Sequence, residues 1–75
     1  MVNQDITSDV MEYMVWVVEL VADEFFDGDK SHTYKVLTEQ GIWDLYIQSY
    51  ESTHSLGASV IIAEISEILK NKEVI

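Results

Sequence analysis

The sequence predicts an all-α fold, a compact small helical bundle in which two longer helices (about 9–26 and 57–71) enclose two short ones (about 32–40 and 42–53). Apolar residues recur at three- and four-residue steps through both long segments, which places them on one side of a helix. The chain has no Pro, and its three glycines fall where one segment gives way to the next. With 75 residues, 48% of them hydrophobic, it has the length of one domain (1–75) and enough apolar side chains for a core.

The segment 9–26 is the stretch around which the rest of the chain is expected to pack. Its apolar side consists of Val10, Tyr13, Met14, Val17, Leu20, Val21 and Phe25. The opposite side carries Asp9, Glu12, Glu19 and Asp23, and Trp16 falls among these acids. Ser8 or Asp9 is suited to cap the helix, with Thr7 as an alternative, and Gly28 is suited to end it.

Two short helices are expected in the middle of the chain. Ser31 or Thr33 is expected to cap the segment 32–40, and Gly41 to end it. Its apolar face would consist of Tyr34, Val36 and Leu37. The segment 42–53 follows almost at once, with one face formed by Trp43, Tyr46, Ile47 and Tyr50.

The last helix, 57–71, is expected to point Val60, Ile61, Ile65, Ile68 and Leu69 inward. The expected core of the bundle consists of Val17, Val21, Phe25, Leu37, Ile47, Ile61, Ile65 and Ile68. The β-branched runs at 15–18 and 60–62 are also compatible with strands. Helix is favoured because both runs lie in longer stretches of helical period and no hairpin turn joins alternating segments.

The charge of the chain is strongly negative, −10 from 14 acids and four lysines, with no Arg. Such a chain repels nucleic acid and anionic membranes, so neither is expected as a partner. Residues 1–29 contain eight acids and no base, which favours a basic protein partner. The chain has neither an apolar run of membrane-spanning length nor a basic region at its N-terminus, and we expect a cytoplasmic protein.

Motifs for catalysis or metal binding are incomplete. The segment 27–31 resembles the start of a calcium loop, but His32 and Thr38 stand where Gly and Glu are needed. Glu51 and His54 have the spacing found in di-iron bundles, but the second such pair is missing. His54 is instead expected to be partly buried and bonded to the backbone at a helix junction. There is no Cys and no nucleophile motif, and we therefore expect no enzyme activity, no metal and no cofactor.

The position of Trp16 among acids is the most informative feature for function. Aromatic residues concentrate at the centres of interfaces, and charges at their rims. Two interpretations stay open: Trp16 contacts another chain, or a helix of its own chain covers it. The candidate interaction residues are Glu12, Trp16, Glu19, Asp23, Tyr50 and His54.

Several segments together resemble a family of small, uncharacterised bacterial proteins classed as a domain of unknown function. They are the apolar first helix, the helix ending at Gly41, the run 42–47 leading to Tyr50, the segment 53–57 with His54 and Gly57, and the isoleucine-rich last helix. Members of that family are often encoded beside proteins resembling ADP-ribosyltransferase toxins. The resemblance implies an antitoxin-like partner role, although the acidic first helix departs from the family.

The composition and the missing motifs predict a non-catalytic, acidic protein-interaction module, and the family resemblance implies that it is an antitoxin-like partner of a neighbouring toxin-type enzyme. The alternative is a structural homodimer with no other partner.

Overall fold

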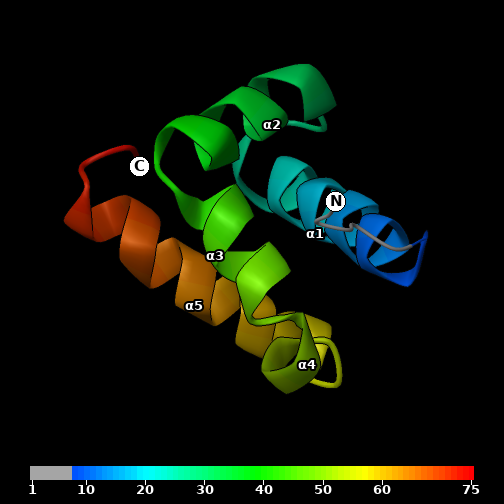
Figure 1. Ribbon diagram of the computed structural model, residues 1–75. Helices are drawn as coiled ribbons and strands as arrows, with labels where there is room; N and C mark the ends of the chain where they lie inside the picture. The colour runs from blue at the N-terminus through cyan, green and yellow to red at the C-terminus, as the bar shows by residue number, and fades with distance from the viewer. Residues whose placement is uncertain (1–7) are drawn as a thin grey trace.

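The computed structural model describes residues 8–75, and this part of the chain forms five helices and no strand. In chain order they are α1 (Ser8–Phe25), α2 (Lys30–Glu39), α3 (Ile42–Gln48), α4 (Tyr50–Thr53) and α5 (Ala58–Asn71). Figure 1 shows the two longer helices, α1 and α5, with the chain passing from one to the other through α2, α3 and α4. The predicted all-α class is confirmed, and the two β-branched runs lie inside α1 and α5.

The start of α1 lies slightly earlier than predicted. Ser8 is its first described residue and Asp9 its second, so neither is the N-cap. Thr7, the alternative cap, lies outside the described residues. Asp9 stands in the first turn, where the helix dipole favours a negative charge.

The end of α1 is fixed by two left-handed residues. Asp27 (φ 55°) and Gly28 (φ 80°) turn the chain after Phe25, and the Gly28 N–H donates to the Ala22 carbonyl at 2.8 Å. This hydrogen bond satisfies one of the carbonyls that a helix end leaves open. Gly28 therefore ends the helix as predicted, and Gly41, also left-handed (φ 77°), does the same after α2.

The start of α2 differs from the prediction. Its N-cap is Asp29, rather than Ser31 or Thr33, and the Asp29 Oδ1 accepts from the His32 backbone N–H at 3.0 Å. An Asp carboxylate satisfies a free N–H at a helix start at least as well as a hydroxyl does, so the earlier cap prevails. Thr33 is fully buried instead, and its hydroxyl donates to the Asp29 carbonyl at 2.7 Å.

The predicted helix 42–53 is divided into α3 and α4 at Ser49. This residue leaves helical geometry (φ −102°, ψ 20°), and its hydroxyl donates to the Leu45 carbonyl at 2.6 Å. A Ser side chain that bonds to a carbonyl four residues back competes with the backbone and bends a helix.

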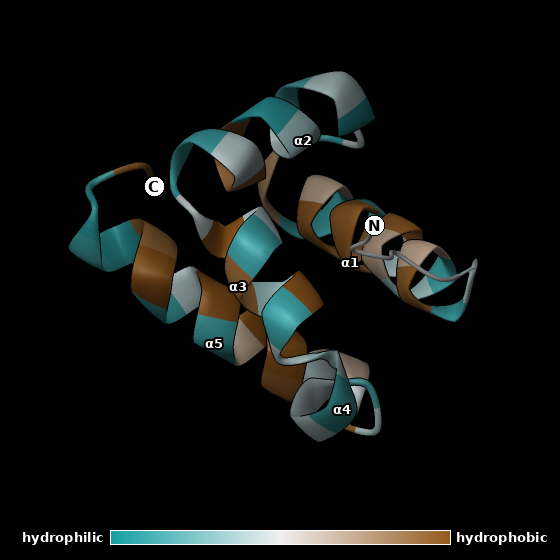
Figure 2. Cartoon of the chain, in the orientation of Figure 1, coloured by the Kyte–Doolittle hydropathy of each residue, from teal (hydrophilic) through white to brown (hydrophobic). Residues whose placement is uncertain are grey.

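The core is formed by residues of α1, α2, α3 and α5. Of the eight predicted core residues, five are fully buried: Val17, Val21, Leu37, Ile61 and Ile65. Phe25, Ile47 and Ile68 are only partly buried and pack against this core. Val60, predicted to point inward, is 43% exposed, and Tyr34, predicted on an apolar face, is 48% exposed. Figure 2 shows the hydrophobic residues concentrated along α1 and in bands on α5.

Two tyrosine hydroxyls connect segments that are distant in sequence. Tyr13 on α1 donates to the Thr53 hydroxyl of α4 at 2.7 Å, and Tyr46 on α3 donates to the Glu64 carboxylate of α5 at 2.6 Å. Both tyrosines are buried, so each hydroxyl needs such a partner. Within residues 8–75, no helix combines the length and the apolar character that crossing a membrane requires.

Candidate functional site

Four of the six predicted interaction residues lie together in one surface hollow between α1 and α4. We call it the aromatic hollow, and its lining consists of Asp9, Glu12, Tyr13, Trp16, Tyr50, His54 and Leu56. The other two predicted residues, Glu19 and Asp23, line separate surfaces. The fold therefore brings Glu12 and Trp16 of the first helix together with Tyr50 and His54, which no sequence spacing indicates.

The floor of the aromatic hollow is Tyr13, which is only 7% exposed. Its ring contacts Tyr50 edge to face, with ring centroids 5.4 Å apart, and lies 6.0 Å from the Trp16 ring at a tilt of 32°. Such edge-on and tilted contacts are favoured geometries of aromatic pairs. The hydrogen bond to Thr53 holds the Tyr13 ring against α4. Burial raises the pKa of the Tyr13 phenol, so it stays a neutral donor.

Trp16 forms one wall of the hollow, and its own chain covers it only in part. It is partly buried and packs against the core, so its own chain covers part of the ring. The remainder of the ring lines the hollow. Trp16 is therefore neither a free surface residue nor a core residue.

The opposite wall is a stack of two rings. His54 lies on Tyr50 with centroids 4.4 Å apart and planes 15° apart. The His54 Nδ1 lies 2.7 Å from the Tyr50 carbonyl oxygen. Because a carbonyl only accepts, Nδ1 must carry the hydrogen, and in the neutral ring Nε2 is left as an acceptor. His54 was expected to be partly buried and is exposed, but its expected bond to the backbone is present.

The rim of the aromatic hollow is acidic. Asp9 and Glu12 are both exposed on α1, four residues and one residue before Tyr13. Within residues 8–75, no lysine lines the hollow. The two lysines nearest to α1 in the sequence, Lys30 and Lys35, lie on α2 and not in the hollow. The two carboxylates are thus available to a positive charge from outside.

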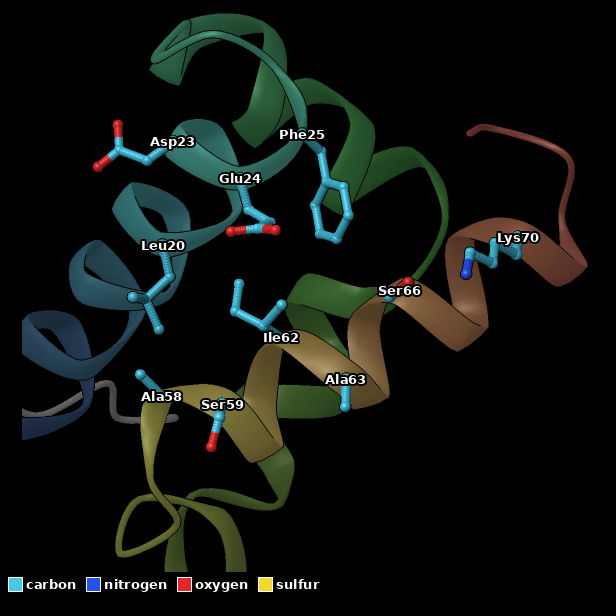
Figure 3. Close-up of a pocket in the computed structure, with 10 residues that line it drawn as sticks. All are labelled: Leu20, Asp23, Glu24, Phe25, Ala58, Ser59, Ile62, Ala63, Ser66 and Lys70. Carbon is cyan, nitrogen blue, oxygen red and sulfur yellow. The ribbon is translucent and has the colours of Figure 1, made fainter.

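A larger groove runs between α1 and α5, and Figure 3 shows it. The lining residues of this α1–α5 groove are Leu20, Asp23, Glu24, Phe25, Ala58, Ser59, Ile62, Ala63, Ser66 and Lys70. Leu20, Phe25 and Ile62 project into it, whereas Asp23 points away. Its volume is about 700 Å³, against about 380 Å³ for the hollow. Four of its residues on α5, Ala58, Ser59, Ala63 and Ser66, have small side chains.

The hollow and the groove follow the same side of α1. Most of their α1 residues succeed one another at steps of three or four, so they form one stripe along the helix: Asp9, Glu12, Tyr13, Trp16, Leu20, Asp23 and Glu24. From residue 9 to residue 24 this stripe is about 22 Å long at a rise of about 1.5 Å per residue. Aromatic and aliphatic side chains occupy its centre, and acids stand at both ends.

A third surface contains the remaining candidate, Glu19. Its carboxylate lies 3.3 Å from the Lys30 Nζ, and both side chains are about half exposed. Beside this ion pair lie Val15, 51% exposed, and the edge-to-face pair Tyr34–Trp43, with centroids 4.8 Å apart. Because Glu19 already has a charged partner, it is a weaker binding residue than an acid of the hollow.

The calcium-like segment has other roles in the structure. Asp29 caps α2, and Lys30 pairs with Glu19. Among residues 8–75, no three His, Asp or Glu side chains lie close enough to hold one metal ion, and this includes Glu51 and His54.

Sequence reasoning missed the α1–α5 groove. A signal was present in the small residues Ser59, Ala63 and Ser66, which recur at steps of four and three on one side of the last helix. Three residues of the hollow, Asp9, Tyr13 and Leu56, were also not among the candidates. Tyr13 belongs to the apolar period of the first helix, and for that reason it was not singled out as a surface residue.

No protein-family model, curated protein or solved structure matches this chain. The resemblance to the family of small bacterial proteins therefore stays a prediction.

Proposed function

We propose that this chain is a non-catalytic, cytoplasmic protein-interaction module that binds a basic protein along the acid-flanked stripe of α1. The observation that carries the proposal is the aromatic hollow, where partly exposed Trp16 and Tyr50 stand beside Asp9 and Glu12. Interface centres are rich in Trp and Tyr, and charges at the rim steer a partner of opposite sign.

The length of the stripe favours a partner that contributes an elongated element. About 22 Å of α1 corresponds to about four turns of a second helix. The α1–α5 groove offers Leu20, Phe25 and Ile62 as apolar contacts, with Asp23 and Glu24 at its edge. A basic amphipathic helix would place apolar side chains in the groove and cations against the acids. For the partner's identity we keep the class that the family resemblance implies, a toxin-type enzyme that this chain neutralises.

A homodimer is the second candidate, and the surface around Val15, Tyr34 and Trp43 favours it. That surface is mostly apolar and includes a residue of each charge, Glu19 and Lys30. In a two-fold dimer, each glutamate can face the lysine of the other copy. The charge of −10 on each chain opposes this association, especially at low salt.

Affinity purification of the tagged chain from its host tests the proposal. The wild type is compared with the double variant Asp9→Asn and Glu12→Gln, which removes two charges from the hollow. The matched control is Glu39→Gln with Glu67→Gln, two exposed acids outside both the hollow and the groove. We expect one basic protein to co-purify in equal amounts with the wild type and with the control. Much less of it should co-purify with the hollow variant.

Two results would count against the proposal. One is equal recovery of the protein with all three chains. The other is that light scattering shows the pure wild-type chain to be a dimer, and that this dimer does not bind the co-purified protein. That result would favour the homodimer.

A further inference from the structure

We infer that the aromatic hollow binds the guanidinium group of an arginine side chain. The inference rests on the proposed function and specifies which group of the basic partner this part of the stripe receives. At about 380 Å³ and open to solvent, the hollow suits a single side chain, whereas the α1–α5 groove, at about 700 Å³, has room for more than one.

The walls of the hollow supply aromatic rings to a cation, chiefly the partly exposed ring of Trp16, because His54 is stacked on one face of Tyr50. Trp16 and Tyr50 are partly exposed, and both contact Tyr13, which forms the floor between them. Cations are attracted to the negative face of an aromatic ring, most strongly to that of Trp. A flat guanidinium stacks on such faces better than a lysine ammonium, which is compact and strongly hydrated.

The rim supplies hydrogen-bond acceptors. The carboxylates of Asp9 and Glu12 line the hollow, and no lysine of residues 8–75 does. A guanidinium has five N–H donors in one plane, so it can bond to more than one of these acceptors while it lies on a ring. Hydrogen bonds in which both groups are charged are the strong ones.

Other occupants fit this lining less well. An apolar side chain would take water away from two carboxylates and offer them no donor. A phosphate or a carboxylate would meet charges of its own sign. A bound calcium ion needs about six to eight oxygen ligands, and two carboxylates beside aromatic rings do not supply them.

The test uses the indole N–H signals of the two tryptophans in an NMR titration. The probes are Nα-acetylarginine amide and Nα-acetylcitrulline amide, which have nearly the same shape and differ in charge, at an ionic strength held constant with NaCl. We expect the arginine probe to shift the Trp16 signal in a saturable way, with a dissociation constant on the order of 10 mM for a single side chain. Trp43, which lies on another surface, serves as the internal control.

Variants decide whether the shift comes from the hollow. The double variant Asp9→Asn and Glu12→Gln should weaken binding of the arginine probe about tenfold, and Glu39→Gln with Glu67→Gln should leave it unchanged. Equal shifts with the citrulline probe, stronger binding of Nα-acetyllysine amide, or equal shifts at Trp43 and Trp16 would each overturn the inference. None of these substitutions removes an aromatic ring, and the dispersion of the spectra checks that each chain is folded.

The two experiments can fail separately. If the arginine probe does not bind while a basic protein still co-purifies in a manner that depends on Asp9 and Glu12, the inference fails and the proposed function stands. If the arginine probe binds while no basic protein co-purifies, the proposed function fails and the hollow remains a cation site.

Discussion

Tyr46 shows how one polar atom in the core depends on a single partner. The residue is 2% exposed, and its hydroxyl donates to the Glu64 carboxylate at 2.6 Å. Burial raises the pKa of this phenol well above its usual value of about 10, and the nearby Glu64 carboxylate raises it further. The hydrogen bond joins α3 to α5, so its loss affects two helices.

The raised pKa of Tyr46 predicts a loss of stability at high pH. Above about pH 10 the unfolded chain releases the phenol proton while the folded chain keeps it. The unfolded state then binds fewer protons, and the free energy of unfolding falls as the pH rises. Tyr46→Phe should lower that free energy by about 1–2 kcal/mol at neutral pH and reduce its fall between about pH 9 and 11.

Urea unfolding at a series of pH values measures this effect. Tyr34→Phe, at a residue that is 48% exposed, is the matched control and should follow the wild type. Equal pH dependence in the Tyr46→Phe variant and the wild type would mean that Tyr46 does not cause the alkaline loss.

Ile65 tests the core at the level of one side chain. It is fully buried in α5, whereas Val60 on the same helix is 43% exposed. Ile65→Ala should lower the free energy of unfolding by about 2–5 kcal/mol, and Val60→Ala should change it by less than about 0.5 kcal/mol. Thermal and urea unfolding measure both. A loss below about 1 kcal/mol for Ile65→Ala would place this residue outside the core.

At the scale of single elements, the glycines at two helix boundaries, Gly41 and Gly57, differ in backbone geometry. Gly41 has φ 77°, a backbone angle that residues other than Gly rarely adopt. A Cβ at this position would meet no atom within 4 Å. Gly57 also has open space but an ordinary backbone, with φ −76°. Because a Cβ would be uncrowded at both positions, comparing the two alanine variants isolates the effect of backbone strain.

We predict that Gly41→Ala lowers the free energy of unfolding by about 1 kcal/mol or more, because Ala is strained in left-handed geometry. Gly57→Ala should change it by no more than about 0.5 kcal/mol, because the gain from a stiffer unfolded chain offsets a slightly poorer helix start. Urea unfolding of both variants measures the difference. Equal effects would show that the left-handed turn at Gly41 is not needed.

The helices themselves were largely predictable, because their apolar period is a local property of the sequence. The period identified both long helices and five fully buried residues, Val17, Val21, Leu37, Ile61 and Ile65. The break at Ser49 was not predictable, since Ser is tolerated inside helices and only its bond to Leu45 shows the bend. Val60 was misassigned because its apolar neighbours in the run 60–62 leave the inward direction of the helix uncertain by one position.

The aromatic hollow could be predicted only in part. Four of its residues were singled out: Glu12 and Trp16 on α1, by the contrast between the aromatic ring and its acidic neighbours, and Tyr50 and His54 further along the chain. That these two groups form one hollow depends on the Tyr13–Thr53 hydrogen bond and on the turn at Ser49. Both are features of the folded chain, and no local pattern indicates them.

At the scale of the whole molecule, charge is the dominant property. The net charge is −10, and within residues 8–75 the Glu19–Lys30 contact is the one ion pair. The molecule has a radius of gyration of 12.0 Å. The screening length of salt is about 30 Å at about 0.01 M and about 10 Å at about 0.1 M, so low salt leaves charges across the whole molecule free to repel each other.

Added NaCl should therefore stabilise the fold. We expect the midpoint of urea unfolding to rise between about 0.01 M and about 0.3 M NaCl, because screening weakens repulsion among the acids more than it weakens one exposed ion pair. A midpoint that stays constant or falls would mean that the acids lie too far apart to affect stability.

Above all, we propose the aromatic hollow as the surface at which a basic partner binds. The most direct measurement replaces Trp16 by the photo-cross-linking residue p-benzoylphenylalanine, which keeps an aromatic group in the wall, and irradiates the chain inside its host. The control is a chain in which p-benzoylphenylalanine replaces Glu67, which is exposed on α5 and lies outside the hollow. We predict that position 16, and not position 67, cross-links to one basic protein, identified by mass spectrometry. Cross-links only to a second copy of this chain, or the same products from both positions, would contradict the proposal.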